Sequence, residues 1–188
     1  MDRAVIISVS PEMCKHIVNG EQTLLLRKLT LYIEPPFKVY ICPTHIHLSG
    51  NVLLFKGKDL VISHYSNADR PGWHKASGNV IGHFICDHIS PFLFNKDDTS
   101  EDIRQSRLIT DSVLDRSCMT KDDFVEYVIG NNKRNIKAVY GWNITKLKIY
   151  DKPKSLNHFV GIRKTYLRET EYKLKGTPKT VYYVKERT

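Results

Sequence analysis

The 188-residue sequence lacks the motifs by which many enzyme classes are recognised. It contains neither a GxxxxGK[ST] nor a GxGxxG phosphate-binding loop. It also lacks the GxSxG segment that places a nucleophilic serine on a sharp turn, and no cysteine sits in a recognisable catalytic context. These absences argue against nucleotide-dependent enzymes with glycine-rich loops and against serine hydrolases.

Cysteine is scarce, and long apolar runs are missing. No run approaches the roughly 20 apolar residues that cross a bilayer, and the N-terminal MDRAVIISVS is typical of a strand rather than a signal peptide. The absence of a CxxC pair favours reduced, mostly buried thiols over a disulfide framework. We therefore expect a cytoplasmic protein without membrane contact. Its four cysteines are Cys14, Cys42, Cys86 and Cys118.

Residues that could bind a metal ion are also sparse. The best candidate ligands are Cys42, His45, His47, Cys86 and His88. Pro43 and the lack of a second clustered ligand pair argue against a metal site. We expect neither a metal ion nor another cofactor.

Charge is distributed unevenly along the chain. The net charge is +9, but residues 1–132 hold 14 Lys/Arg against 16 Asp/Glu, a balance of −2, whereas residues 133–188 hold 15 against 4, a balance of +11. A basic segment of this kind is typical of a protein that binds a polyanion, most simply nucleic acid. The alternative is a solubilising surface.

The pattern predicts an α+β protein, a small mixed β-barrel with a flanking N-terminal helix and a helical insertion. The helix is predicted over 11–18, with Ser10 as N-cap and Gly20 as terminator. Thr120 and Asp123 resemble a capping box within an acidic insertion at about 95–130. Strands are predicted over 4–9, 22–28, 37–42, 52–55, 60–64, 80–86, from 138 onward and over 181–184. We expect one domain over residues 1–188, with a basic C-terminal extension at about 153–188.

The stretch GEQTLLLRK, residues 20–28, contains Arg27, whose guanidinium needs a partner. Alternation along a strand places Leu25 and Arg27 on one face and the leucines at 24 and 26 on the other. An unpaired buried guanidinium is costly, whereas its planar fork suits a phosphate, a carboxylate or a base edge. An internal ion pair with Glu12 or Asp87 is the equally weighted alternative.

Two further segments combine cations with aromatic residues. In the loop 66–79, Trp73 and His74 lie beside Arg70 and Lys75, which is typical of base stacking with phosphate contact, although a tryptophan folding back over the core is an alternative. In the C-terminal extension, basic residues are interleaved with tyrosines at positions 166, 172, 182 and 183, which favours a nucleic-acid surface, although a twisted hairpin whose lysines extend along apolar surface is an alternative. The basic residues predicted to bind nucleic acid are Arg70, Lys75, Arg163, Lys164 and Arg168.

Four ordered segments, ISVSPEMCKHIVNGEQTLLLRK, PPFKVYIC, NVIGHFICD and YGWNITKLKIYDKP, together resemble the ASCH family of the PUA-like superfamily. The similarity runs from about Ile6 to Pro153 and covers most of the chain. The resemblance implies a small PUA-like β-barrel with a helix beside a cleft, and RNA or nucleotide binding is the usual proposal for that cleft. Some small bacterial members are amidohydrolases that deacylate N4-acetylcytidine with a lysine and a threonine after the first helix and a distant glutamate.

The sequence departs from the family pattern at the positions of the family's catalytic groups. The signature reads approximately GxKxxExR, and here Gly20 and Arg27 match it, whereas Gln22 stands at the lysine position and Leu25 at the acidic position. Leu25 also stands where the amidohydrolases keep their threonine, with Thr23 nearby. Glutamine is no proton-transferring amine, and leucine is neither nucleophile nor base. The changes favour binding over catalysis.

We therefore expect an RNA- or nucleotide-binding protein in which Arg27 contacts a phosphate or a base edge in the cleft. The other cleft residues are Gly20, Gln22, Thr23, Trp73 and His74. One alternative is a hydrolase acting on a modified nucleoside such as N4-acetylcytidine, or on RNA. In it, His83 or His74 is the acid/base group, and His83 stands where the hydrolases often keep a glutamate. The other alternative is a protein-interaction module that uses the acidic insertion.

Overall fold

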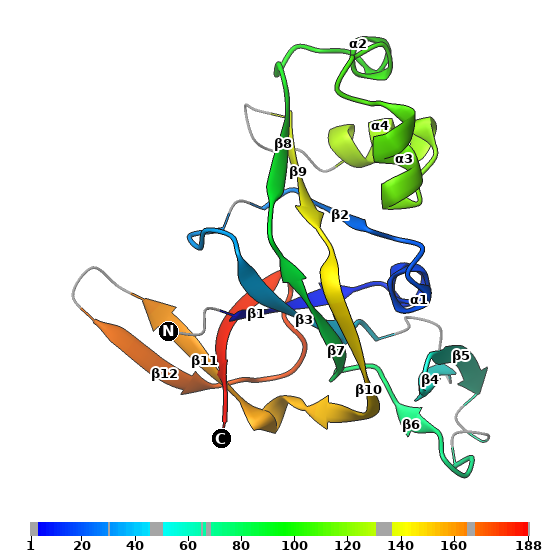
Figure 1. The fold of residues 1–188 in the computed structure, drawn as a ribbon, viewed down its shortest axis with the longest axis vertical. Coiled ribbons are helices and arrows are strands. Elements are labelled where there is room, and N and C mark those ends of the chain that lie inside the picture. The colour runs from blue at the N-terminus through cyan, green and yellow to red at the C-terminus, as the bar shows by residue number, and fades with distance from the viewer. Residues whose placement is uncertain are drawn as a thin grey trace.

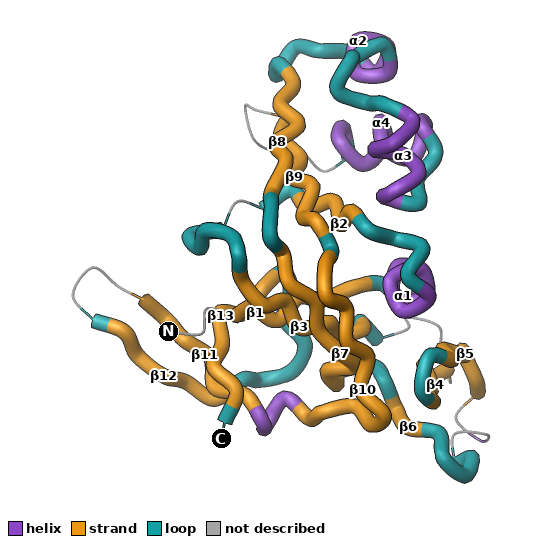
Figure 2. Tube along the Cα trace, in the orientation of Figure 1, coloured by secondary structure: helices purple, strands orange, loops and turns teal. Residues whose placement is uncertain are grey.

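The computed structural model describes residues 4–29, 31–45, 51–64, 66, 69–130, 137–164 and 168–187. These residues form a mixed α+β fold with three β-sheets, a helix beside the largest sheet, and a group of short helices at one end (Figure 1). Figure 2 shows that the α-helices are confined to α1 and to the insertion. The predicted α+β class is confirmed.

The first strand and helix form as local sequence signals predict. β1 (Ala4–Val9) is buried along its whole length. The Ser10 hydroxyl then accepts a hydrogen bond from the Met13 amide, 3.3 Å away, and caps α1 (Pro11–Asn19). The helix ends at Gly20, whose φ of 77° is a left-handed conformation that glycine adopts without strain.

The largest sheet has seven strands in the order β10-β7-β3-β1-β13-β11-β12. β1 runs parallel to β3, and the other pairs are antiparallel. The remaining strands of this sheet are β3 (Phe37–Pro43), β7 (Asn79–Cys86), β10 (Thr145–Ser155), β11 (Phe159–Lys164), β12 (Glu169–Lys173) and β13 (Val181–Glu186). A 3₁₀ turn, η2 (Leu156–His158), joins β10 to β11.

Two three-stranded sheets flank this sheet. One has the order β2-β9-β8, and the other has the order β5-β4-β6. Their strands are β2 (Leu24–Arg27), β8 (Ile89–Phe94), β9 (Lys137–Asn143), β4 (Asn51–Lys56), β5 (Asp59–His64) and β6 (His74–Lys75).

The predicted barrel closure does not occur among the described residues. Closure would require the edge strands β10 and β12 to pair through a continuous set of strands, but each has one partner within the seven-stranded sheet. β2, β8 and β9 pair with one another instead of completing that sheet. The described part of the chain is therefore a set of open sheets.

The segment predicted to be a helical insertion contains three short helices. They are α2 (Ser100–Arg104), α3 (Asp111–Ser117) and α4 (Lys121–Ile129). The capping box predicted at Thr120 and Asp123 is present, and Thr99 forms a second one with Asp102 at the start of α2. None of the helices in the described part of the chain combines the length and apolar character needed to cross a lipid bilayer.

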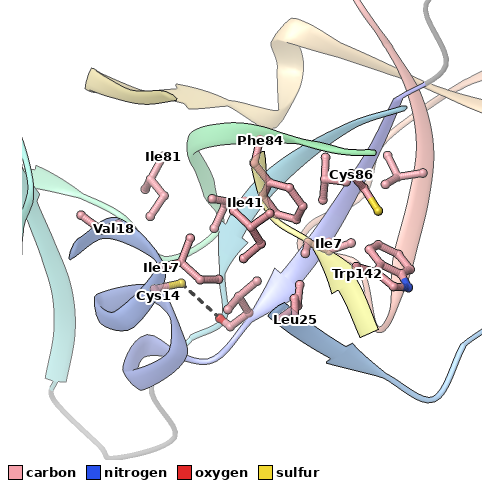
Figure 3. Close-up of a cluster of buried hydrophobic side chains, with 14 of the residues drawn as sticks. Ile7, Cys14, Ile17, Val18, Leu25, Ile41, Ile81, Phe84, Cys86 and Trp142 are labelled. Carbon is pink, nitrogen blue, oxygen red and sulfur yellow. Dashed lines mark hydrogen bonds between the residues drawn. The ribbon is translucent and has the colours of Figure 1, made fainter. Parts of the chain in front are cut away.

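Three main clusters of buried side chains stabilise this arrangement. Figure 3 shows the central one, where Ile17 of α1, Leu25 of β2 and Trp142 of β9 meet Ile41 and Phe84 of the large sheet. The opposite face of the large sheet buries a second cluster, which includes Ile6, Tyr40, Phe159 and Val184. The insertion helices cover a third, which includes Leu24, Leu26, Phe92, Phe124 and Val139. β2 is thus buried on both faces.

Candidate nucleic-acid interface

Arg27 lies at the end of β2, on the Leu25 side of the strand. Its Nη2 donates a hydrogen bond to the Ser8 carbonyl oxygen, 2.5 Å away, while its Nε is buried without a hydrogen-bond partner among the described residues. Burial lowers the pKa of the guanidinium. The ion pairs found in the described ranges do not include Arg27, so Glu12 and Asp87 are not its partners there. Arg27 is part of the packing between β1 and β2.

The residues before Arg27 also point inward. Gln22 is 1% exposed, and its Nε2 donates to the Leu24 carbonyl oxygen at 3.1 Å, while its Oε1 has no partner within the described chain. Leu25 is fully buried in the central cluster. The Thr23 hydroxyl accepts a hydrogen bond from Nε of Arg116 at 3.3 Å, which ties β2 to α3. Residues 22–25 are therefore structural groups in this conformation.

A cavity of about 290 Å³ lies beside Gly20. It is an open cavity that is lined by the C-terminal end of α1, the turn between β4 and β5, and β10. Lys58 and Asp151 supply its charged groups, and Leu147 and Ile149 line its apolar side. Of the predicted cleft residues, Gly20 lines this cavity, whereas Arg27 and Gln22 do not.

His74 lies on a different sheet from Arg27, and Trp73 immediately precedes it. Trp73 packs against Val52 and Leu54 of β4, and His74 begins β6, which pairs with β4. The neighbouring Arg70 and Lys75 are exposed. In Figure 1, β6 is separated from β2 by α1 and the large sheet. The structure therefore does not bring the predicted stacking pair Trp73–His74 to Arg27.

His83 lies on the opposite face of the large sheet from Arg27. Its Nδ1 lies 2.9 Å from the Tyr150 hydroxyl, and its ring contacts Tyr40 of the second buried cluster. Burial lowers the pKa of His83, and the nearby Lys38 and Lys148 lower it further. Arg27, in contrast, lies on the side of the sheet that carries the central cluster, together with Leu25. The hydrolase arrangement that pairs His83 with Arg27 is not assembled in this structure.

Candidate metal ligands are likewise dispersed. The part of the chain that the structure describes contains no group of three His, Cys, Asp or Glu side chains that could hold a metal ion. His47 lies outside the described residues. Burial raises the pKa of Cys42 and of Cys86 to about 12 in each case, so both thiols stay protonated at neutral pH.

The basic C-terminal extension forms an exposed part of the large sheet. Arg163 and Lys164 end β11, and Arg168 immediately precedes β12; all three side chains are exposed. In Figure 1, β11 and β12 project away from the sheet centre, on the side opposite α1. The structure therefore brings the predicted residues Arg163, Lys164 and Arg168 to one hairpin, and places Arg70 and Lys75 elsewhere.

A groove of about 350 Å³ runs over this hairpin and β13. Its lining residues are Arg163, Thr170, Tyr172, Lys173, Lys175 and Tyr182. The guanidinium of Arg163 lies 5.7 Å from the centre of the Tyr172 ring, and the two tyrosine rings are 6.5 Å apart at 82°. Three of the lining residues are basic, two are tyrosines and none is acidic.

Acidic side chains of the same strands are already neutralised by a lysine. Lys185 of β13 lies 2.8 Å from a carboxylate oxygen of Glu169 and 3.8 Å from one of Glu171, both on β12. Strand alternation places Glu169 and Glu171, and with them Lys173, on the opposite face of β12 from Tyr172. The carboxylates of β12 therefore do not oppose the positive charge of the groove.

The sequence predicts Arg163 as an individual binding residue, whereas Tyr172, Lys173 and Lys175 are recognised only as part of a basic extension that contains tyrosines. Their grouping depends on the register of β11 and β12, in which Arg163 faces Thr170 and Gly161 faces Tyr172. The alternation of tyrosine and lysine in the extension was the only local signal for the groove.

Comparison with known proteins gives a structural likeness. No family model and no curated protein matches the chain. The crystal structure of ASCH from Zymomonas mobilis is similar with a TM-score of 0.48 and 14% identity, over 98% of this chain and 90% of that chain. Two mutant structures of the same protein show TM-scores of 0.46 and 13% identity, over 97–98% of this chain and 89–90% of theirs. The likeness to ASCH proteins thus extends over nearly the whole chain, and at this identity it assigns neither ligand nor activity.

Proposed function

We propose that this protein binds RNA and holds the RNA backbone across the face of β11, β12 and β13. The observation that carries the proposal is the groove that is lined by Arg163, Lys173 and Lys175 together with Tyr172 and Tyr182. Cations that contact phosphate supply most of the sequence-independent affinity for nucleic acid, and aromatic rings beside them offer stacking surfaces for bases.

The wider charge distribution supports the same surface. Residues 133–188 carry 15 of the 29 basic residues and only 4 of the 20 acidic ones. Within this segment, Glu169 and Glu171 are bound by Lys185, and Glu186 is bound by Lys154. The ion pairs in the described residues leave out Arg163, Lys173 and Lys175. Their charge is available to a polyanion.

The proposal is tested by titrating a labelled, short single-stranded RNA at several salt concentrations. Affinity should fall steeply with salt, and three phosphate contacts contribute about −2 to the slope of log K against log salt. The combined substitution Arg163→Ala, Lys173→Ala and Lys175→Ala should weaken binding at low salt and flatten the slope by about that amount.

A matched control removes the same charge elsewhere. The combined substitution Lys96→Ala, Arg107→Ala and Lys121→Ala removes three exposed cations of the insertion segment, which Figure 1 shows at the other end of the molecule from β12. This variant should bind RNA nearly as well as the unmodified protein. Equal losses in both triple variants, or no RNA binding by the unmodified protein, would contradict the proposal.

The cavity beside Gly20 supports a second candidate function, binding of a nucleoside-like ligand. Its volume of about 290 Å³ is near the lower end of small-molecule sites. Lys58 and Asp151 offer one donor and one acceptor group beside apolar walls from Leu147 and Ile149. Calorimetric titration with nucleosides and nucleoside monophosphates tests this candidate; binding that survives Lys58→Ala with Asp151→Ala would exclude the cavity as the site.

A further inference from the structure

The groove over β11–β13 contains two tyrosine rings, which binding of the phosphate backbone alone would not require. We infer that the Tyr172–Tyr182 groove accepts the face of an unpaired base, so that the protein binds single-stranded RNA in preference to a duplex; this inference rests on the proposed RNA binding. Phosphate contacts alone would not distinguish the two forms so sharply, since both present a charged backbone.

Gly161 leaves the space that the Tyr172 ring occupies. The ring lies so close to the β11 backbone that a Cβ atom at position 161 would be 2.4 Å from its Cζ atom. Tyr172 directly faces Gly161 in the antiparallel register, and the ring of Tyr182 approaches it edge-on. Tyr172 is thus held by its neighbours in one place while part of its ring remains exposed to the groove. A fixed aromatic surface lowers the entropy that is lost when a base stacks on it.

The charges around the two rings match the flanking backbone of a single strand. Arg163, Lys173 and Lys175 line the same groove as the tyrosines, so phosphates on either side of a stacked base would meet cations. Burial raises the pKa of Tyr172, which keeps its phenol neutral beside those phosphates. In a duplex, each base is paired and stacked on its neighbours, and its face is not available.

The inference is tested by comparing one RNA sequence as a labelled single strand and as a duplex. The single strand should bind at least 10-fold more tightly, as expected for one or more stacking contacts. Tyr172→Ala should weaken single-strand binding about 10-fold and leave duplex binding nearly unchanged, whereas Tyr172→Phe keeps the ring and should keep the affinity. Tyr32→Ala removes a tyrosine that is 99% exposed elsewhere and should change neither value.

A second measurement needs no variant and covers the case in which Tyr172→Ala fails to fold. An abasic sugar–phosphate strand of the same length has the same charge but no bases, and it should bind the unmodified protein about 10-fold more weakly than the RNA strand. Equal affinities for the abasic strand, the single strand and the duplex would overturn the inference while leaving the proposed RNA binding intact. Absence of binding to every form would instead overturn the proposed function.

Discussion

Arg27 links two sheets from inside the molecule. It belongs to β2, which pairs with β9, yet its Nη2 donates to the Ser8 carbonyl oxygen of β1 in the large sheet. The hydrogen bond is charge-assisted and partly buried, so its loss would leave the Ser8 carbonyl without this donor. The structure favours a stabilising role for Arg27 over the phosphate contact that its sequence context predicted.

Substitution of Arg27 separates the two roles. Arg27→Ala should lower the free energy of unfolding by about 1–3 kcal/mol, as measured by urea denaturation, because a buried acceptor loses its charged donor. RNA affinity of the folded variant should stay within about 2-fold of the unmodified protein, since Arg27 does not line the groove. If the variant were as stable as the unmodified protein but had lost RNA affinity, the result would instead support the predicted phosphate contact of Arg27.

His83 gives the protein a pH-dependent contribution to stability. Burial is the main cause of its lowered pKa, so the folded state favours the neutral imidazole. As the pH falls below about 6.5, His83 of the unfolded chain takes up a proton before His83 of the folded protein does. The unfolding free energy therefore decreases over the interval between this pH and the lower pKa of the folded state. The groups that surround His83 are Tyr40, Tyr150, Lys38, Lys148, Lys154 and Glu186.

The expected result is a decline in unfolding free energy as the pH falls from neutral to below the ordinary histidine pKa of about 6.5, part of which depends on His83. His83→Gln cannot titrate, so its unfolding free energy should decline less over that interval. Chemical denaturation at a series of pH values measures both proteins. Parallel curves for the two would show that His83 does not couple protonation to folding.

At the scale of single elements, helix ends are the features that sequence predicts best. Ser10, Gly20 and the pair Thr120–Asp123 act on backbone groups within a few residues of themselves, so their roles follow from local chemistry. β12 gave no such signal, because its sequence ETEYK is polar and lies at a sheet edge. Its existence depends on pairing with β11, which no short window of sequence reveals.

The cap of α4 should carry a measurable share of stability. The Thr120 hydroxyl accepts a hydrogen bond from the Asp123 amide, and α4 buries Phe124 and Val128 in the third cluster. Thr120→Ala should therefore lower the unfolding free energy by about 1 kcal/mol. Thr120→Ser keeps the hydroxyl and should lie within a few tenths of a kcal/mol of the unmodified protein in the same thermal or urea measurement. A loss as large in the serine variant would mean that the methyl group, not the cap, matters.

At the scale of the whole molecule, the large sheet connects the core to the basic face. β1 is at its centre, β13 pairs with β1, and β11 and β12 extend the sheet outward.

The α+β class and the helical segment at about 95–130 could be predicted from composition and periodicity. The open sheets could not, because the choice of β9 rather than a main-sheet strand as partner of β2 is a long-range packing outcome. The separation of Arg27, Trp73 and His83 has the same origin.

The most direct test of the account is the location of bound RNA on the folded protein. Backbone amide signals of isotopically labelled protein can be followed by NMR while short single-stranded RNA is added. The largest shifts should occur within β11, β12 and β13, with little change at Gly20 and Lys58 beside the other cavity. Shifts confined to that cavity, or spread over α2–α4 without change in β11–β13, would contradict the proposed RNA-binding face.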